Sequence, residues 1–93
     1  MTREKLDDIL YELDIDDIGK LNGDKYTITL NDSEDYAYYY SILDHNENLD
    51  LVDSSSVSTE FLNVCTYEGP DYTVSLNADF NKDYYNITIE DLK

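Results

Sequence analysis

Positive charge is what this chain most conspicuously lacks, because residues 26–81 contain no lysine and no arginine over 56 positions. The whole chain has 6 lysines and arginines against 22 aspartates and glutamates, which gives a formal net charge of −16. Proteins that bind nucleic acid take most of their affinity from basic side chains on phosphates. We therefore expect no direct binding of nucleic acid and no binding to membranes, and we expect partners that are positively charged.

Cysteine and histidine are equally scarce. Cys65 is the only cysteine, so no intramolecular disulfide can form, which is typical of a reducing compartment. With His45 as the only histidine, the chain also lacks the ligands of a zinc site. No apolar run approaches the ~20 residues of a membrane-spanning helix, and the amphipathic start of the chain leads us to expect no signal peptide.

The residues that support catalysis or calcium binding are missing as well. Only 3 glycines are present, with no glycine-rich phosphate loop and no motif of a Ser-His-Asp or Cys-His site. A domain of this size has little depth for a sugar between paired carboxylates. Residues 44–50 alternate acids and amides as in a calcium-binding loop, but Leu49 and Ser55 replace the required glycine and glutamate. We expect no enzyme, no metal site and no cofactor.

The length of 93 residues predicts a single domain, 1–93, with a modest core. Its first segment has the pattern of an amphipathic helix over residues 3–13, with Thr2 as the N-cap. The apolar stripe of this helix is Leu6, Ile9, Leu10 and Leu13. A second face carries an acid every four residues, at Glu4, Asp8 and Glu12, which is typical of a solvated surface.

From Lys25 onward, side chains of similar character recur every second residue, which indicates strands. The predicted strands cover residues 25–31, 36–43, 49–52, 58–67, 72–80 and 84–89. Short turns such as Asn31–Asp35 separate them, so neighbouring strands must be antiparallel. The predicted fold is α+β, with the N-terminal amphipathic helix packed on one face of a five- to six-stranded antiparallel sheet. Which tyrosines of the 36–43 strand are buried is left open, because neither of its faces is clearly polar.

Two of the predicted strands look alike. Residues 23–31 align without gaps to residues 69–77, with five of nine positions identical and a shared pattern Tyr-Thr-[Ile/Val]-[Thr/Ser]-Leu-Asn. One interpretation is an internal repeat of two hairpins, each followed by an acidic turn. The other is that two strands of a tyrosine-rich chain resemble each other by chance.

Acids and tyrosines together suggest a binding surface. The acids between residues 26 and 81 gather in the predicted turns Asp32–Asp35 and Asp44–Asp53, with the tyrosine-rich run 36–40 between them. Carboxylates held on a rigid scaffold imitate the charge of a phosphate backbone, and tyrosine is frequent at the centre of protein interfaces. The predicted partner-binding residues are Asp32, Glu34, Asp35, Tyr36, Tyr38, Tyr40, Asp44, Glu47, Asp50 and Asp53.

In size, charge and helix-plus-sheet character, the whole chain resembles a class of small acidic phage-encoded inhibitors that mimic nucleic acid. The class includes many anti-CRISPR proteins, anti-restriction proteins and the phage inhibitor of uracil-DNA glycosylase. Its members share charge rather than a motif, so no functional residue is transferred to this chain. The resemblance implies a DNA mimic in the cytoplasm of a bacterial host, which inhibits a CRISPR effector or another defence nuclease by filling its basic groove.

Two alternatives remain open from the sequence. Immunity proteins that neutralise a nuclease toxin are also small and acidic, and they bind basic enzymes. An acidic adaptor protein with no enzyme target is the third possibility. Each of these functions is compatible with a monomer or a small homo-oligomer.

Overall fold

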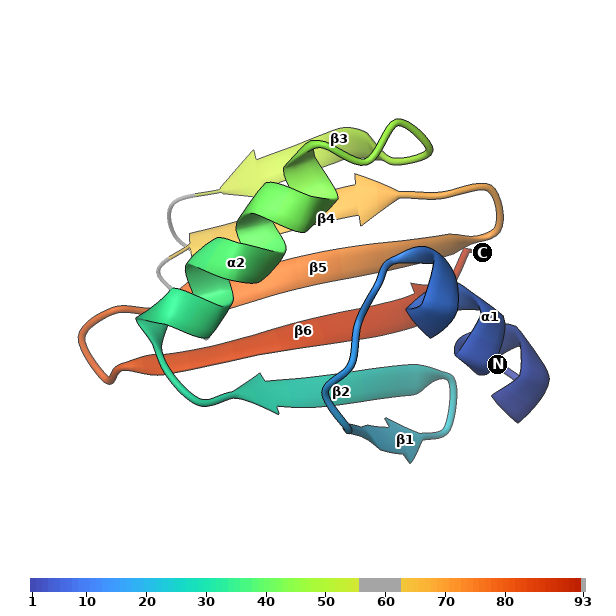
Figure 1. Cartoon of the computed structure of the whole chain (residues 1–93), viewed down its shortest axis with the longest axis horizontal. Coiled ribbons are helices and arrows are strands. Elements are labelled where there is room, and N and C mark those ends of the chain that lie inside the picture. The colour runs from blue at the N-terminus through green and yellow to red at the C-terminus, as the bar shows by residue number, and fades with distance from the viewer. Residues whose placement is uncertain (56–62, 93) are drawn as a thin grey trace.

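A computed structural model describes residues 1–55 and 63–92, and these parts contain two helices and one six-stranded sheet (Figure 1). The helices are α1 (Arg3–Glu12) and α2 (Ser33–Asp44). The strands are β1 (Lys20–Asn22), β2 (Lys25–Leu30), β3 (Asp50–Ser55), β4 (Asn63–Glu68), β5 (Tyr72–Asp79) and β6 (Tyr84–Asp91). Their spatial order is β1-β2-β6-β5-β4-β3, and every neighbouring pair is antiparallel. The predicted α+β class, its N-terminal helix and its six antiparallel strands are confirmed.

Helix α1 forms as its sequence predicts. The side chain of Thr2 accepts a hydrogen bond from the backbone N–H of Lys5 and caps the first turn. Leu6, Ile9 and Leu13 are buried in the core, whereas the acidic face is exposed. No helix in the described part of the chain is long and apolar enough to cross a membrane.

Both helices cover the same face of the sheet, where the core lies. Helix α2 runs diagonally across the strands, and α1 lies at the end of the sheet near the C-terminus (Figure 1). The strands bury alternate residues beneath them, and six of the ten tyrosines belong to this core. The core tyrosines are Tyr26, Tyr36, Tyr39, Tyr67, Tyr72 and Tyr85. The opposite face of the sheet carries mainly threonine, serine and asparagine, which explains how the strands alternate.

The prediction of a strand over residues 36–43 is wrong, because these residues lie within α2. The predicted turn Asn31–Asp35 is also wrong in part, since Ser33 already begins the helix and Asp32 caps it. Tyr36, Tyr39 and Leu43 are the buried residues of α2, and their spacing of three and four is that of a helix. Tyrosine favours strands by intrinsic preference, but here the cap and the packing decide.

The interpretation of two repeated hairpins is wrong for the same reason. Residues 25–30 and 72–79 are both strands, but β2 leads into a helix whereas β5 continues into β6. The two strands lie on either side of β6 and are not parts of equivalent hairpins. The short edge strand β1 was not predicted. It pairs with β2 through a tight turn in which Gly23 has a φ of 65°.

The remaining strand predictions are confirmed within their described parts. The 25–31, 72–80 and 84–89 predictions match β2, β5 and β6 closely. The predicted strand 49–52 corresponds to β3, which continues to Ser55. Of the predicted strand 58–67, residues 63–67 belong to β4, and residues 58–62 lie outside the described part of the chain.

Candidate binding surface

Helix α2 carries or adjoins most of the predicted binding residues, and its N-terminus is stabilised by acids. The carboxylate of Asp32 accepts hydrogen bonds from the backbone N–H groups of Glu34 at 3.1 Å and Asp35 at 3.0 Å. Glu34 and Asp35 then lie in the first helical turn, where negative charge favours the helix dipole. These three acids are therefore well placed for the helix itself.

The acids at the other end of α2 are not explained by stability. Asp44 is the last residue of the helix, where negative charge opposes the dipole, and no base lies in that turn. The loop that follows contains the exposed Glu47, and β3 then places Asp50 directly opposite Glu68 of β4. Like charges opposite each other destabilise a sheet. This part of the chain keeps negative charge against the preference of its local structure.

The predicted acids therefore form two groups, one at each end of α2. Asp32, Glu34 and Asp35 form the N-terminal group. Asp44, Glu47 and Asp50 form the C-terminal group, and the two groups are separated by about 18 Å along the helix axis at 1.5 Å per residue. All six are exposed except Asp35, which is half-buried. We call this set the α2 acidic surface. Asp53 lies on β3 opposite Thr66, with its side chain outside the described part of the chain.

The three predicted tyrosines do not share a face. Tyr38 and Tyr40 are 54% and 41% exposed and are available to a partner. Tyr36 is only 9% exposed, so its prediction as a partner-binding residue is wrong. Its ring packs against the sheet at 5.4 Å from that of Tyr85, and its hydroxyl accepts a hydrogen bond from Asn63. The prediction assumed the two-residue period of a strand, whereas a helix turns these side chains to different sides.

The positive charges gather at the opposite end of the molecule, around the start of α1. The N-terminal amine lies 2.6 Å from Asp91 and 3.2 Å from Asp24, and Lys5 forms ion pairs with Asp71 and Asp91. Hydrogen bonds from Lys5 and the N-terminal amine lower the pKa of the Asp91 carboxyl. Two further pairs, Arg3–Asp7 and Lys25–Glu90, join residues of α1, β2 and β6.

The α2 acidic surface has no such neutralisation. Within residues 1–55 and 63–92, none of its six acids forms an ion pair with a base. The chain therefore pairs its bases with acids at one end and leaves the acids of α2 uncompensated. Negative charge on this side is concentrated beyond what the net charge alone requires.

Several neighbours of the α2 N-terminus were not predicted from the sequence. Phe80 is 51% exposed at the end of β5, and its ring lies 5.7 Å from that of Tyr36. Burial raises the pKa of the Tyr85 hydroxyl, and the negative charges of Asp83, Asp32 and Asp79 raise it further. The sequence did indicate a turn at residues 81–83. It had no signal that this turn lies beside α2, since α2 itself was not predicted.

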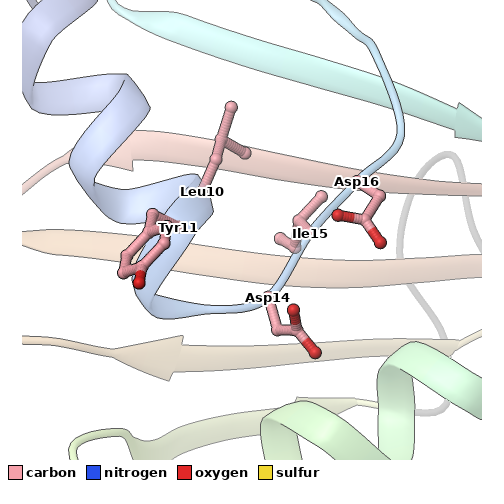
Figure 2. Close-up of a pocket in the computed structure, with 5 residues that line it drawn as sticks. All are labelled: Leu10, Tyr11, Asp14, Ile15 and Asp16. Carbon is pink, nitrogen blue, oxygen red and sulfur yellow. The ribbon is translucent and has the colours of Figure 1, made fainter.

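A separate hollow lies next to α1, as Figure 2 shows. It has a volume of ≈ 490 Å³, and its lining combines apolar side chains with two carboxylates. The lining residues are Leu10, Tyr11, Asp14, Ile15 and Asp16. Tyr11 is 89% exposed, so this hollow is a second place where an aromatic ring and acids meet at the surface. None of its residues was among the predicted binding residues.

Comparisons of the chain with protein-family models, curated proteins and solved structures found no match. Among the described residues, no group of three or more His, Cys, Asp or Glu side chains is arranged to hold a metal ion. The physical features of the surface are therefore the basis for a functional proposal.

Proposed function

We propose that this protein is a non-enzymatic acidic inhibitor that binds the basic nucleic-acid groove of a host nuclease through its α2 acidic surface. Because the chain resembles phage-encoded inhibitors, CRISPR effector nucleases are the first targets to test. The observation that carries the proposal is the segregation of charge. The bases are paired with acids around the start of α1, and the acids of α2 are left unpaired within the described residues.

The arrangement of α2 suits a groove that normally holds phosphates. Phosphates of one DNA strand are spaced about 3.4 Å apart along the duplex axis, so the ~18 Å between the two acidic groups covers about five of them. The groups are fixed to one helix whose other side is packed into the core by Tyr39 and Leu43. A partner therefore meets charges that are already in position, which reduces the entropy lost on binding.

The cost of keeping these charges also supports a role in binding. Asp44 opposes the helix dipole, and Asp50 lies opposite Glu68 on the neighbouring strand. Attraction between this surface and a basic groove accelerates association, and salt weakens that attraction. The same surface fits an immunity protein that neutralises a nuclease toxin, because such a toxin presents the same kind of groove.

The proposal is tested by capturing proteins from a bacterial lysate on the immobilised protein at low and at high salt. We expect a nucleic-acid-binding enzyme whose capture is strongest at low salt and is reduced by added DNA or guide RNA. A captured protein that binds equally well at both salt concentrations, and is not displaced by nucleic acid, would point to an acidic adaptor instead.

Charge-neutralised variants then locate the surface. The variant Asp32→Asn, Glu34→Gln and Asp35→Asn retains an N-cap, because asparagine caps helices as well as aspartate. The variant Asp44→Asn, Glu47→Gln and Asp50→Asn changes the other end. Both are expected to remain folded and to inhibit more weakly than the wild type.

The matched control is the triple variant Glu4→Gln, Asp8→Asn and Glu12→Gln, which removes three exposed acids from α1. It changes the net charge by the same amount as each α2 variant. If it weakens inhibition as much as they do, net charge rather than the α2 acidic surface is responsible. If only the α1 variant loses inhibition, the binding surface lies on α1.

A further inference from the structure

Four aromatic rings meet where the start of α2 contacts the β5–β6 turn. Phe80 packs edge-on against two core tyrosines, with ring centroids 5.7 Å from Tyr36 and 5.8 Å from Tyr85. Tyr36 in turn lies 5.4 Å from Tyr85 and 6.4 Å from Tyr40. We call Tyr36, Tyr40, Phe80 and Tyr85 the aromatic platform.

The platform is half core and half surface. Tyr36 and Tyr85 are buried, at 9% and 3% exposure, and they hold Phe80 from below. Phe80 and Tyr40 keep 51% and 41% of their surface exposed. Edge-to-face contacts fix the orientation of a ring while leaving part of its surface free. A leucine at position 80 would cover the two tyrosines equally well, so packing alone does not account for a half-exposed phenylalanine.

Negative charge surrounds these rings. The charges of Asp83, Asp32 and Asp79 all act on the Tyr85 hydroxyl and raise its pKa, in addition to the effect of burial. The carboxylate of Asp79 is held in place, because it accepts hydrogen bonds from the backbone N–H groups of Asn81 at 3.1 Å and Lys82 at 3.2 Å. Lys82 is the one base of this turn and is exposed.

An exposed aromatic ring among carboxylates is the arrangement that binds an organic cation. The face of the ring attracts the cation, and carboxylates accept its hydrogen bonds. Arginine fits better than lysine, because its planar guanidinium stacks on a ring while its N–H groups point outward to carboxylates. A nucleic-acid base also stacks on aromatic rings, but its phosphates are repelled by these acids.

We propose that the aromatic platform binds an arginine side chain of the basic partner protein. The guanidinium stacks on the exposed side of Phe80, next to Tyr40, within reach of the Asp32 and Asp83 carboxylates. The assignment of this arginine to a nuclease depends on the proposed function, whereas the binding of arginine by the platform does not.

The direct test is an NMR titration of the isotope-labelled full chain with a short glycine peptide that contains arginine. Two matched peptides contain citrulline, which has the shape of arginine without its charge, or lysine. We expect the arginine peptide to shift the ring signals of Phe80 and Tyr85 and to show contacts from its δ-methylene protons to Phe80. The citrulline peptide is expected to cause no saturable shift, and the lysine peptide a weaker one.

Two conservative variants separate the ring from the general charge of the surface. Phe80→Leu keeps an apolar side chain on the core tyrosines and is expected to weaken binding of the arginine peptide by about two- to fivefold, as for an exposed cation–π contact. Tyr11→Leu removes an exposed ring beside the acidic hollow of α1 and is expected to leave this binding unchanged. Equal binding by wild type and Phe80→Leu, or shifts centred on Tyr11, would overturn the proposal.

The same variants keep this proposal distinct from the proposed function. If the captured enzyme is inhibited equally by wild type and Phe80→Leu, the inhibitor function stands and the arginine site is wrong. If the platform binds the arginine peptide but no nucleic-acid-binding enzyme is captured, the site stands and the proposed function is wrong.

Discussion

The hydroxyl of Tyr39 donates a hydrogen bond of 2.6 Å to the Asp17 carboxylate. Tyr39 lies on the buried side of α2, and Asp17 lies in the segment between α1 and β1. This segment is also held against the sheet, because the backbone N–H of Gly19 donates to the Tyr26 hydroxyl at 2.7 Å. A Cβ at Gly19 would lie 2.3 Å from the carbonyl oxygen of Thr27, so only glycine allows this approach. The Tyr39–Asp17 bond thus connects α2 to the segment that follows α1.

Replacing Tyr39 with phenylalanine should destabilise the fold. The variant leaves the half-buried Asp17 carboxylate without its hydrogen bond, and bonds to charged groups contribute about 1–3 kcal/mol. We predict a loss of that size in the free energy of unfolding, measured by urea denaturation at neutral pH. Tyr38→Phe is the matched control, because Tyr38 is 54% exposed and should change stability by less than about 0.5 kcal/mol. Equal stability of the two variants would show that the bond contributes nothing.

The same substitution should have the opposite effect at Tyr72. This side chain is 1% exposed, and its hydroxyl has no hydrogen-bond partner among the described residues. Removing a buried, unpaired hydroxyl also removes the cost of its desolvation. We predict that Tyr72→Phe leaves the free energy of unfolding unchanged or raises it by up to about 1 kcal/mol. A clear loss of stability would mean that the hydroxyl is paired in solution.

Alkaline pH should destabilise the protein through its buried tyrosines. Burial raises the pKa of Tyr72 to about 12, helped by the charges of Glu12 and Asp71, whereas an unfolded tyrosine has a pKa of about 10. The folded state therefore favours the neutral phenol, and this contribution to stability is complete below pH ~10 and is lost as pH rises toward ~12. Burial raises the pKa of Tyr36, Tyr39 and Tyr67 in the same direction.

The measurement is the free energy of unfolding at several pH values above neutrality, with phenolate absorbance recorded in parallel. Wild type should lose stability steadily above pH ~10, and Tyr72→Phe should lose it less steeply. Parallel curves for the two proteins would show that Tyr72 titrates equally in the folded and unfolded states.

Sequence patterns predicted the elements whose periodicity agrees with their burial. Helix α1 and strands β2, β5 and β6 each bury one regular stripe, and each was predicted close to its bounds. Helix α2 was not, although its signals are present: Asp32 as an N-cap, acids in the next turn, and apolar residues at 36, 39 and 43. Four aromatic residues in five positions gave an equally good match to a strand, and only packing against the sheet decides between the two.

The binding surface was predictable to a similar extent. The acids were identified correctly as exposed, because charge in a chain of this size has no other place to lie. Tyr36 was assigned to the surface because a strand was assumed, and it is buried. Phe80 and Asp83 were missed because they reach α2 only through the tertiary fold, at a separation of more than 40 residues along the chain.

Salt should change stability and binding in opposite directions. The net charge of −16 repels itself in the folded state, and raising the ionic strength from ~0.01 M to ~0.1 M shortens the Debye length from about 30 Å to about 10 Å. We predict that the thermal midpoint of the free protein rises with added salt while its affinity for a basic partner falls. A midpoint that falls with salt would mean that the ion pairs around α1 outweigh the repulsion elsewhere.

The central claim is that the α2 acidic surface and nucleic acid compete for the same groove. The most direct measurement follows the fluorescence anisotropy of labelled DNA or guide RNA bound to the captured enzyme while this protein is added. We predict that the nucleic acid is released as the protein binds, and that the variant Asp44→Asn, Glu47→Gln, Asp50→Asn requires a higher concentration for the same release. A stable ternary complex, in which the enzyme holds its nucleic acid and this protein together, would contradict the claim.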